Sequence, residues 1–368
     1  MGILKTALYE VHRELGAVLT EFAGWEMPLR YGRLGEEVMS VRERVGCFDV
    51  SHMGRLVLSG ERVVEFLNYV SSNQMDVREG RTRYTLVLNE RGGIKDDDVA
   101  MRIGEKEFLM VVNAASREKI LNWVKKINEE GEFRVDIQDV TFKTVMVAVQ
   151  GPEARQLVHR VVGQEFTMRK FRVRKTEVLG SEAVVSRTGY TGEDGYEIIV
   201  FDTSAGIELF RRLVEAGATP CGLEARDVLR LEAGLPLYGA DMDEDTDPFE
   251  ARLDFAVKMD KGDFIGREAL LERSKSVKRV RVGLMSRGRR VPRRGARVLW
   301  RGKEVGVVTS GAYSPTVGRG IGMAYLSPDV PEGTEVTVEV RGRPIEAEVR
   351  GFPFYDEKVY GWRRVRPS

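Results

Sequence analysis

The 368-residue sequence contains few cysteines and histidines, the residues that define several protein classes. Its two cysteines, Cys47 and Cys221, lie far apart and form no CxxC pair. Its three histidines share no spacing typical of metal ligands: His12, His52 and His159. These scarcities exclude a disulfide-stapled scaffold and a Cys/His zinc site. No metal site is therefore expected.

Long apolar runs and an excess of charge of one sign are missing as well. The longest apolar runs, at 108–112 and 145–149, are far too short to span a membrane, and no apolar leader is visible at the N-terminus. The 58 Lys and Arg nearly balance the 57 Asp and Glu, whereas a disordered chain would combine low hydrophobicity with a large net charge. We therefore expect a folded, cytoplasmic protein of two to three domains, with no membrane and no nucleic-acid partner.

The order of the periodic segments predicts an α+β body over residues 1–278 and a β-domain over residues 279–368. Apolar residues at helical spacing predict helices over 36–46, 62–70, 116–127, 152–162, 205–215 and 224–235. Alternating or continuous apolar runs predict strands over 84–89, 97–103, 107–113, 144–150, 182–187 and 196–201. After residue 279 only strand-like segments occur, at 279–285, 296–300, 305–310, 335–340 and 346–351. Gly and Pro turns separate them, which is typical of a small antiparallel barrel.

Several catalytic motifs are absent from the sequence. There is no P-loop, no GxGxxG at a strand-to-helix junction, no HExxH and no GxSxG. The acidic run 241–247 resembles the start of an EF-hand loop. However, it has Thr246 where that loop needs Gly and Arg252 where it needs a bidentate Glu, so calcium binding is rejected.

A first candidate site residue is Asp97, in the segment GGIKDDDVAMRI at 92–103. In a strand, alternate side chains share a face. Asp97 then shares one face with three apolar residues: Val99, Met101 and Ile103. Asp96 and Asp98 fall on the other face, which is mostly polar. A carboxylate on an apolar face is costly unless it has a partner, so Asp97 is either functional or caps the preceding Gly-Gly turn. The residues alone leave both interpretations open.

A second candidate is Glu197, in SRTGYTGEDGYEIIVF at 186–201. Glycines at 189, 192 and 195 indicate a tight loop that exposes its backbone. The strand that follows is apolar on both faces except for Glu197, which shares its face with Ile199 and Phe201. An acid in such a strand is more often functional than structural. The alternative is a salt bridge to a buried arginine.

A third candidate is Arg226, in CGLEARDVLR at 221–230. Arg226 and Arg230 are four residues apart and lie on one helix face. The residues by themselves favour a solvated, salt-bridged face.

Long motifs spread over nearly the whole chain point to one family. They are FAGWEMPLRY (22–31), VGCFDVSHMG (45–54), LNERGGIKDDD (88–98), VVNAA (111–115), QGP (150–152), SRTGYTGEDGYE (186–197), GLEARDVLRLEAGLPLYGADMDEDTDPFE (222–250), VVTSGAYSP (307–315) and FPFY (352–355). With these motifs the chain resembles the aminomethyltransferase (T protein) family of the glycine cleavage system.

The resemblance implies a fold, a reaction and a set of site residues. The fold is a body of two interleaved subdomains (1–278) and a β-barrel domain (279–368) around a central folate channel. The reaction is transfer of the aminomethyl carbon from the lipoylated H protein to tetrahydrofolate, giving 5,10-methylenetetrahydrofolate and ammonia, with no metal. The essential acid of the family matches Asp97, and two folate-site residues match Glu197 and Arg226. Less distinctive pocket positions match three further residues: Tyr84, Asn113 and Tyr190.

The chain also departs from the family at several positions. A C-terminal Arg of the family helps to bind folate, but the tail YDEKVYGWRRVRPS does not distinguish Arg363 from Arg364. Asp98 replaces a residue that is usually apolar, and we expect little effect on the chemistry. Related iron–sulfur assembly proteins carry a Cys where this chain has KGDFIGREAL, at 261–270. Related demethylases alter the acid motifs that are intact here.

One basic stretch, Lys275–Lys303, holds twelve Lys and Arg and no Asp or Glu. A solvated surface is the usual outcome for such a run. Binding of nucleic acid is least favoured, because Trp300 is the only aromatic residue there that could stack on a base. Docking of an acidic H protein is the third interpretation, since a lipoyl arm must be delivered in repeated, charge-steered encounters.

Overall fold

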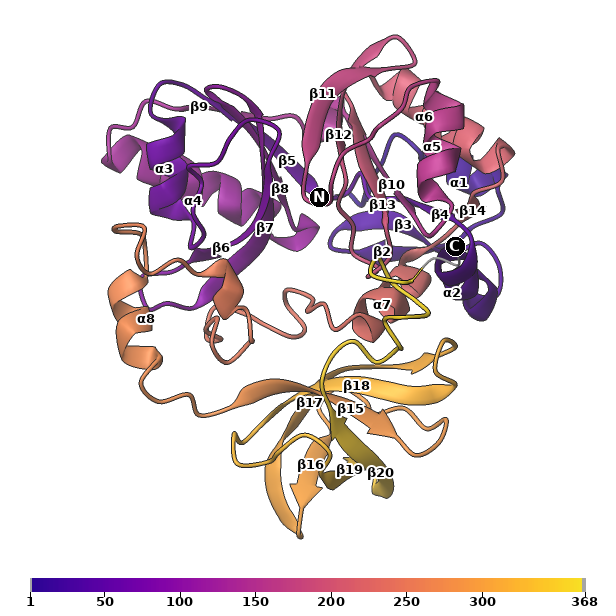
Figure 1. Cartoon of the computed structure of the whole chain (residues 1–368), viewed down its shortest axis with the longest axis vertical. Helices are drawn as coiled ribbons and strands as arrows, with labels where there is room; N and C mark the ends of the chain where they lie inside the picture. Colours follow the sequence, from indigo (N-terminus) through magenta and orange to yellow (C-terminus); the bar gives the residue numbers. More distant parts are fainter. Residues whose placement is uncertain (1, 366–368) are drawn as a thin grey trace.

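A computed structural model describes residues 2–365 of the chain. Figure 1 shows three lobes around a common centre: two lobes of mixed helices and strands, and a barrel made of the C-terminal strands. The chain builds part of the first lobe, crosses to the second and returns to complete the first. It then passes the second lobe again, over residues 242–273, before it enters the barrel. The expected α+β class with a C-terminal antiparallel barrel is confirmed.

The first lobe contains a six-stranded sheet in the order β11-β12-β13-β10-β4-β14. Its strands are β4 (Gly46–Asp49), β10 (Val145–Gln150), β11 (Val173–Val178), β12 (Ser181–Ser186), β13 (Gly195–Val200) and β14 (Thr219–Pro220). Its helices are α1 (Tyr9–Glu14), α2 (Leu34–Glu43), α5 (Ala154–Val162), α6 (Thr203–Glu215) and α7 (Leu223–Glu232). Apolar residues of α1, α5 and α6 pack on one face of the sheet, and residues of α2 and α7 belong to the core on the other.

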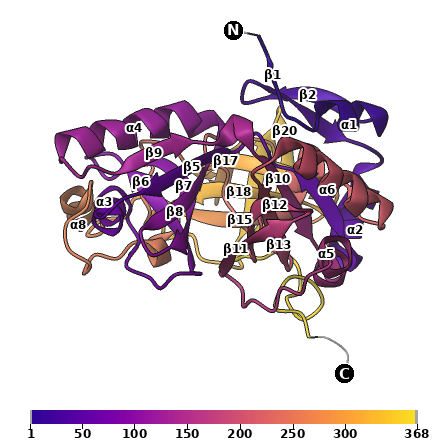
Figure 2. The same ribbon diagram turned by 90° about the horizontal axis from the view of Figure 1, so that it is seen from above.

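A small three-stranded sheet, β1-β3-β2, lies at the N-terminal end of the chain. Its strands are β1 (Leu4–Lys5), β2 (Val18–Phe22) and β3 (Trp25–Arg30). Figure 2, seen from above, places this sheet beside α1, away from the second lobe.

The second lobe contains a five-stranded sheet in the order β6-β7-β8-β5-β9. Its strands are β5 (Gly54–Ser59), β6 (Thr82–Leu88), β7 (Ile94–Gly104), β8 (Glu107–Val112) and β9 (Asp136–Asp139). Helices α3 (Val63–Val70) and α4 (Arg117–Glu130) cover its outer face, and α8 (Arg267–Arg273) lies near its end in Figure 1. Ser116 precedes α4, and its side chain makes no capping hydrogen bond.

The barrel closes in the order β15-β18-β17-β16-β19-β20. Its strands are β15 (Val280–Ser286), β16 (Arg297–Trp300), β17 (Lys303–Ser314), β18 (Arg319–Leu326), β19 (Glu335–Val340) and β20 (Arg343–Arg350). The sequence did not predict β18. Its glycines read as turn signals, but Gly320 allows the backbone to approach the carbonyl oxygen of Arg290 more closely than a Cβ would permit. The boundary between 278 and 279 stays a prediction, because the start of a strand does not define a unit that folds by itself.

The inner faces of the two sheets meet in one apolar core. Val99, Met101 and Ile103 of β7 pack there with β4, β10 and α7, as the alternation of β7 predicted. The other face of β7 is mostly polar, as the sequence indicates, yet it is buried as well. Ala100 belongs to the core under α3 and α4, and Asp96 and Asp98 are fully buried. The reason is that helices cover this sheet on the outside as well. Within residues 2–365, no helix combines the length and the apolar character needed to cross a membrane.

Candidate functional site

Asp97 lies on β7, between β6 and β8 in the sheet, and neighbours from both of these strands hold its carboxylate. The Tyr84 hydroxyl on β6 donates to Asp97 Oδ2 at 3.1 Å. Asn113, directly after β8, donates from Nδ2 to Asp97 Oδ1 at 2.8 Å. The Tyr84 ring stacks on Phe255, with the ring centroids 5.8 Å apart. The carboxylate is therefore fixed in orientation by two donors from two strands.

The alternative role for Asp97, capping of the Gly-Gly turn, is wrong. The Asn89 side chain caps this turn, because its Oδ1 accepts from the backbone N–H groups of Arg91 at 3.0 Å and Gly93 at 2.9 Å. An Asx-type side chain at the start of the turn thus fills the position that the alternative gave to Asp97.

Three consecutive buried or partly buried aspartates differ in their partners. Asp96 accepts from the backbone N–H and from Nδ2 of Asn113, at 3.0 and 2.9 Å. Both carboxylate oxygens of Asp98 are buried and have no hydrogen-bond partner among the described residues. Burial and the charge of Asp96 raise the pKa of Asp97 and of Asp98 well above that of an ordinary aspartate. Donors to Asp97 oppose this shift, whereas Asp98 has no such donors, so Asp98 is the group of the three best suited to hold a proton.

Glu197 lies on β13 and points to the inner face of the first lobe. It is 8% exposed and lies in register with Ser186 of β12. The Thr188 hydroxyl donates to Glu197 Oε2 at 2.5 Å. Among the described residues Glu197 has no ion pair, so the salt bridge considered for it is not found. Its carboxylate is held by a hydroxyl only.

Arg226 lies on α7, and its guanidinium sits over the ring of Tyr190 at 4.8 Å from the centroid. Its Nη1 is buried and has no hydrogen-bond partner within residues 2–365. Burial lowers the pKa of Arg226, and the charge of Glu197 opposes that shift. The solvated, salt-bridged face favoured for this arginine is therefore wrong. This leaves a buried guanidinium N–H that is free to donate a hydrogen bond.

Arg230 shares that helix face but is buried in a different network. Its Nη1 contacts Asp241 Oδ2 at 2.5 Å, and its Nη2 donates to the Ser310 hydroxyl on β17 at 2.9 Å. Arg230 is only 2% exposed, so a solvated surface is wrong here as well. It connects α7 to the barrel.

The two halves of the site come together at Tyr190. Its hydroxyl donates to the Pro236 carbonyl. Burial raises the pKa of Tyr190, the nearby Arg226 and Arg230 oppose this shift, and Asp97 adds to it. A single hydroxyl therefore lies within electrostatic reach of Asp97 from the second lobe and Arg226 from the first. Five of the candidate site residues are partly exposed: Tyr84, Asp97, Asn113, Tyr190 and Arg226. Glu197 is the exception, because it is buried.

His52 is a neighbour of the site that the sequence analysis did not single out. It is fully enclosed, its Nδ1 has no partner among the described residues, and Phe22 packs edge-on against its ring. Burial, together with the charge of Arg226, lowers the pKa of His52 to about 3, so this histidine is neutral. In the sequence, the feature that could have drawn attention to His52 was its position in the motif VGCFDVSHMG.

The C-terminal arginines differ in their surroundings. Arg364 contacts the Glu193 carboxylate and donates to the Arg42 carbonyl at 3.0 Å, beside the buried pair of Arg42 and Glu232 at 2.7 Å. Arg363 is exposed and lies 3.4 Å from Glu357. Arg364 is thus held in an internal ion-pair network, and Arg363 is available to solvent.

Across the described residues, no group of three or more His, Cys, Asp and Glu is placed to hold a metal ion.

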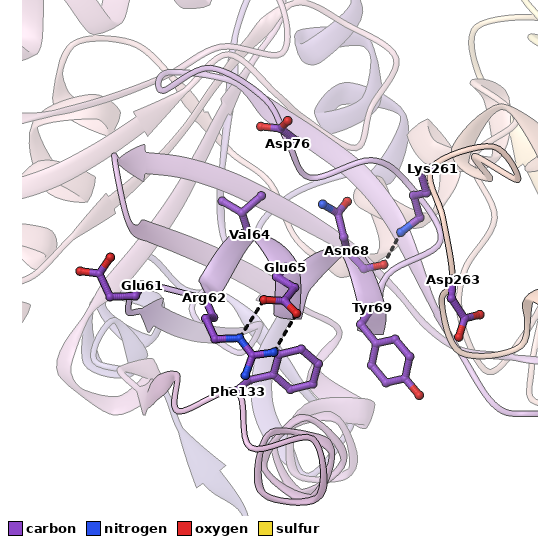
Figure 3. Close-up of a pocket in the computed structure, with 10 residues that line it drawn as sticks. All are labelled: Glu61, Arg62, Val64, Glu65, Asn68, Tyr69, Asp76, Phe133, Lys261 and Asp263. Atoms are coloured by element: carbon purple, nitrogen blue, oxygen red, sulfur yellow. Dashed lines mark hydrogen bonds and ion pairs between the residues drawn. The ribbon is translucent and has the colours of Figure 1, made fainter.

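A cavity lies outside the candidate site. This open cavity of about 680 Å³ lies beside α3, where Lys261 donates to the Asn68 carbonyl (Figure 3). Lys261 also donates to the Ser71 carbonyl at 2.6 Å. Burial lowers the pKa of Lys261 to about 7. None of the candidate site residues lines this cavity.

Comparisons with known proteins agree along the whole chain. Residues 8–261 match the family described as the GCVT N-terminal domain, and residues 279–356 match the glycine cleavage T-protein C-terminal barrel domain. An aminomethyltransferase from Thermotoga neapolitana is 45% identical over 96% of this chain and 98% of its own length. One from Aquifex aeolicus is 42% identical over 95% of both chains. The crystal structure of glycine cleavage system aminomethyltransferase T from Bartonella henselae superposes with a TM-score of 0.91, at 34% identity over 98% of this chain and all of that one.

Proposed function

The chain belongs to the glycine cleavage T-protein family and is an aminomethyltransferase, and from this premise we propose how its site carries out the reaction. The proposed donor is the aminomethyl group on the lipoyl arm of the H protein. The proposed acceptor is tetrahydrofolate. The products are 5,10-methylenetetrahydrofolate, ammonia and the dihydrolipoyl arm.

We assign the binding of tetrahydrofolate to the face formed by Glu197, Arg226 and Tyr190. The Glu197 carboxylate accepts hydrogen bonds from the amino and ring N–H groups of the pterin. Arg226 donates to a folate oxygen, and its buried Nη1 without an acceptor is the observation that best supports this role. Tyr190 holds the Arg226 guanidinium on its ring and positions it.

The bond changes need no protein nucleophile. The two folate nitrogens, N5 and N10, each form a bond to the methylene carbon, while the C–S and C–N bonds of the aminomethyl group break. The two protons that leave N5 and N10 are taken up by the sulfur, which becomes a thiol, and by the amine, which leaves as ammonia. The protein has to hold a folate nitrogen against the carbon, a proximity contribution that can be large.

Asp97 is the residue that we propose to act on the reacting atoms. Positive charge of iminium type develops on the methylene carbon as the amine or thiol leaves, and a fixed carboxylate stabilises that charge. Two hydrogen bonds, from Tyr84 and Asn113, keep the Asp97 carboxylate in place before the substrate arrives. Because burial and Asp96 raise the pKa of Asp97, relay of a proton to the leaving amine is a second role for the same group.

The barrel supplies a surface for the acidic partner. Several cations of the basic stretch 275–303 are neutralised, as in the pairs of Arg287 with Glu335 and Arg297 with Glu339. Four others are exposed and have no ion pair within residues 2–365: Arg289, Arg290, Arg293 and Arg294. We propose that these four arginines attract the H protein.

The deciding experiment supplies aminomethylated H protein and tetrahydrofolate to the purified chain, without NAD, pyridoxal phosphate or added metal. Methylenetetrahydrofolate and ammonia should form in equal amounts. Tight binding of folate without transfer above the uncatalysed rate would instead make the chain a folate-binding module and would refute the proposed reaction.

A further inference from the structure

Asp98 is a buried acid that has no role in the reaction as proposed above. It follows Asp97 on β7, and its side chain is fully buried on the outer face of the second-lobe sheet. Neither of its two carboxylate oxygens has a hydrogen-bond partner among the described residues. An ionised carboxylate that is buried without donors is costly, so the fold favours the protonated form of Asp98.

Asp96 is the neighbour of Asp98 on the same face of β7. Residues two apart in a strand share a face, with their Cα atoms about 7 Å apart. The Asp96 carboxylate accepts two hydrogen bonds from Asn113, from the backbone N–H at 3.0 Å and from Nδ2 at 2.9 Å. After burial, the charge of Asp96 and a hydrogen bond between the two carboxyl groups raise the pKa of Asp98. A proton held between two neighbouring carboxyl groups avoids two buried negative charges side by side.

Asn113 connects this pair of acids to Asp97. Its Nδ2 donates to Asp96 Oδ1 at 2.9 Å and to Asp97 Oδ1 at 2.8 Å. An amide nitrogen carries two hydrogens, so one side chain holds both carboxylates. The position of the Asp96 carboxylate therefore sets the orientation of the amide that holds Asp97.

The cation that acts on Asp98 is bound to other groups. Lys119 of α4 opposes the rise in the pKa of Asp98. Its ammonium group, however, donates to the Tyr238 hydroxyl at 2.6 Å and to Glu244 at 3.0 Å. Lys95 pairs with the same Glu244, at 3.4 Å.

The remaining elements on this face bring few charges to Asp98. On β6, Thr85 is in register with Asp98, and the one charged residue of β6 on this face is Arg83, in register with Ala100. Helix α3 and strand β8 contribute apolar side chains to the core there, and Figure 1 shows α3 and α4 on the side of the sheet away from the first lobe. An ionised Asp98 would therefore face Asp96 and Asp97 without a cation bound to it.

We propose that Asp98 is a positioning residue for the transfer reaction: its protonated carboxyl keeps Asp96 on Asn113, and Asn113 keeps the Asp97 carboxylate in place. The inference rests on the proposed role of Asp97, and it differs from the expectation that Asp98 has little effect on the chemistry. When Asp98 loses its proton, the two buried carboxylates repel each other, and Asp96 turns away from Asn113. Asp97 then keeps only the hydrogen bond from Tyr84.

The active enzyme thus combines an ionised Asp97 with a protonated Asp98. Donors from Tyr84 and Asn113 oppose the rise in the pKa of Asp97, whereas Asp98 has no such donors, so Asp97 loses its proton first as pH rises. Turnover should therefore fall on the acid side as Asp97 gains a proton and on the alkaline side as Asp98 loses one.

The test measures kcat and the KM for tetrahydrofolate across neutral and alkaline pH. In the wild type kcat should fall about tenfold along the alkaline limb, the order expected when one hydrogen bond to a charged group is lost. The KM for tetrahydrofolate should stay within about twofold, because Glu197 and Arg226 do not depend on Asp98. The limb should be absent from Asp98→Asn, whose amide is neutral at every pH and still donates toward Asp96.

Two further variants complete the comparison. Asp98→Leu also carries no charge at any pH and should lack the alkaline limb, so it replaces Asp98→Asn if that variant folds poorly. Asp136→Asn is the matched control, because it removes an exposed carboxylate from the edge strand β9 of the same sheet, and it should keep the wild-type profile.

Three outcomes would overturn the inference. They are a wild type without an alkaline limb, a limb that persists in a folded neutral variant of Asp98, and a limb that appears in the KM for tetrahydrofolate instead of in kcat. The second outcome would assign the limb to another group. Failure of the proposed function is distinguishable, since the wild type would then transfer no aminomethyl group at any pH.

Discussion

Replacement of Asp97 by Asn tests the central assignment with the least disturbance of the structure. The Asn amide oxygen can still accept from Asn113 Nδ2, which lies 2.8 Å from Asp97 Oδ1. The amide N–H₂ then faces the Tyr84 hydroxyl, 3.1 Å from Oδ2, and that hydroxyl can rotate to accept instead of donate. The hydrogen-bond pattern therefore survives, and only the negative charge is lost.

We expect Asp97→Asn to lower turnover by about a hundredfold or more, while folate affinity stays within a few-fold of wild type. One preorganised electrostatic group typically contributes about 10²–10³ in kcat, which corresponds to about 2.7–4 kcal/mol of transition-state stabilisation. The melting temperature should be unchanged or higher, because a partly buried charge beside Asp96 is removed. Steady-state formation of methylenetetrahydrofolate, folate titration and thermal melting measure the three quantities.

The pH profile gives an independent readout of the same variant. The ionised form of Asp97 is the active one, so wild-type activity should fall as pH drops through the raised pKa of this group. That acid limb should lie above the range of an ordinary aspartate, and it should vanish from the residual activity of Asp97→Asn.

Asp96→Asn serves as the matched control. It removes one negative charge from the residue next to Asp97, on the other face of β7. It should lower turnover less than Asp97→Asn does. Near-normal turnover of Asp97→Asn, or an equal loss in both variants, would refute the assignment of Asp97 to the reacting atoms.

Three further predictions address binding, docking and stability. Glu197→Gln and Arg226→Ala should mainly weaken folate binding in titrations; unfolding of both variants with unchanged affinity per folded molecule would instead indicate a structural role. Reversal to Glu of the four exposed barrel arginines should raise the KM for H protein severalfold, most strongly at low salt, and leave turnover of free aminomethyl-dihydrolipoate nearly unchanged. The four residues are Arg289, Arg290, Arg293 and Arg294. An equal effect on both substrates would contradict docking. Asp98→Asn should stabilise the fold at pH 8 by about 1–3 kcal/mol, because the wild type buries a carboxylate without donors. Folding raises the pKa of the Asp98 carboxyl, so this group costs stability as pH rises above its unfolded pKa. Denaturant titrations should therefore show the stability difference between Asp98→Asn and the wild type shrinking toward pH 4. A difference that does not depend on pH would refute this prediction.

Local periodicity was enough to predict several features of the fold and the site. Strand alternation placed Asp97 with Val99 and Met101, and Glu197 with Ile199, on the faces that the structure shows. Gly and Pro turns between short strands predicted the C-terminal barrel. These predictions succeeded because the two-residue repeat of a strand and the conformations of turns depend on neighbouring residues only.

Contacts between distant segments decided the rest. The burial of Asp98 depends on helices that cover the outer face of β7, and the burial of Arg230 depends on its contacts with Asp241 and the barrel. The approach of Asp97 to Tyr190 requires two lobes built from interleaved stretches of the chain. A single sequence does not distinguish a solvated charged residue from one that is buried against a distant partner. The reason is that the position of the partner is set only when the lobes pack.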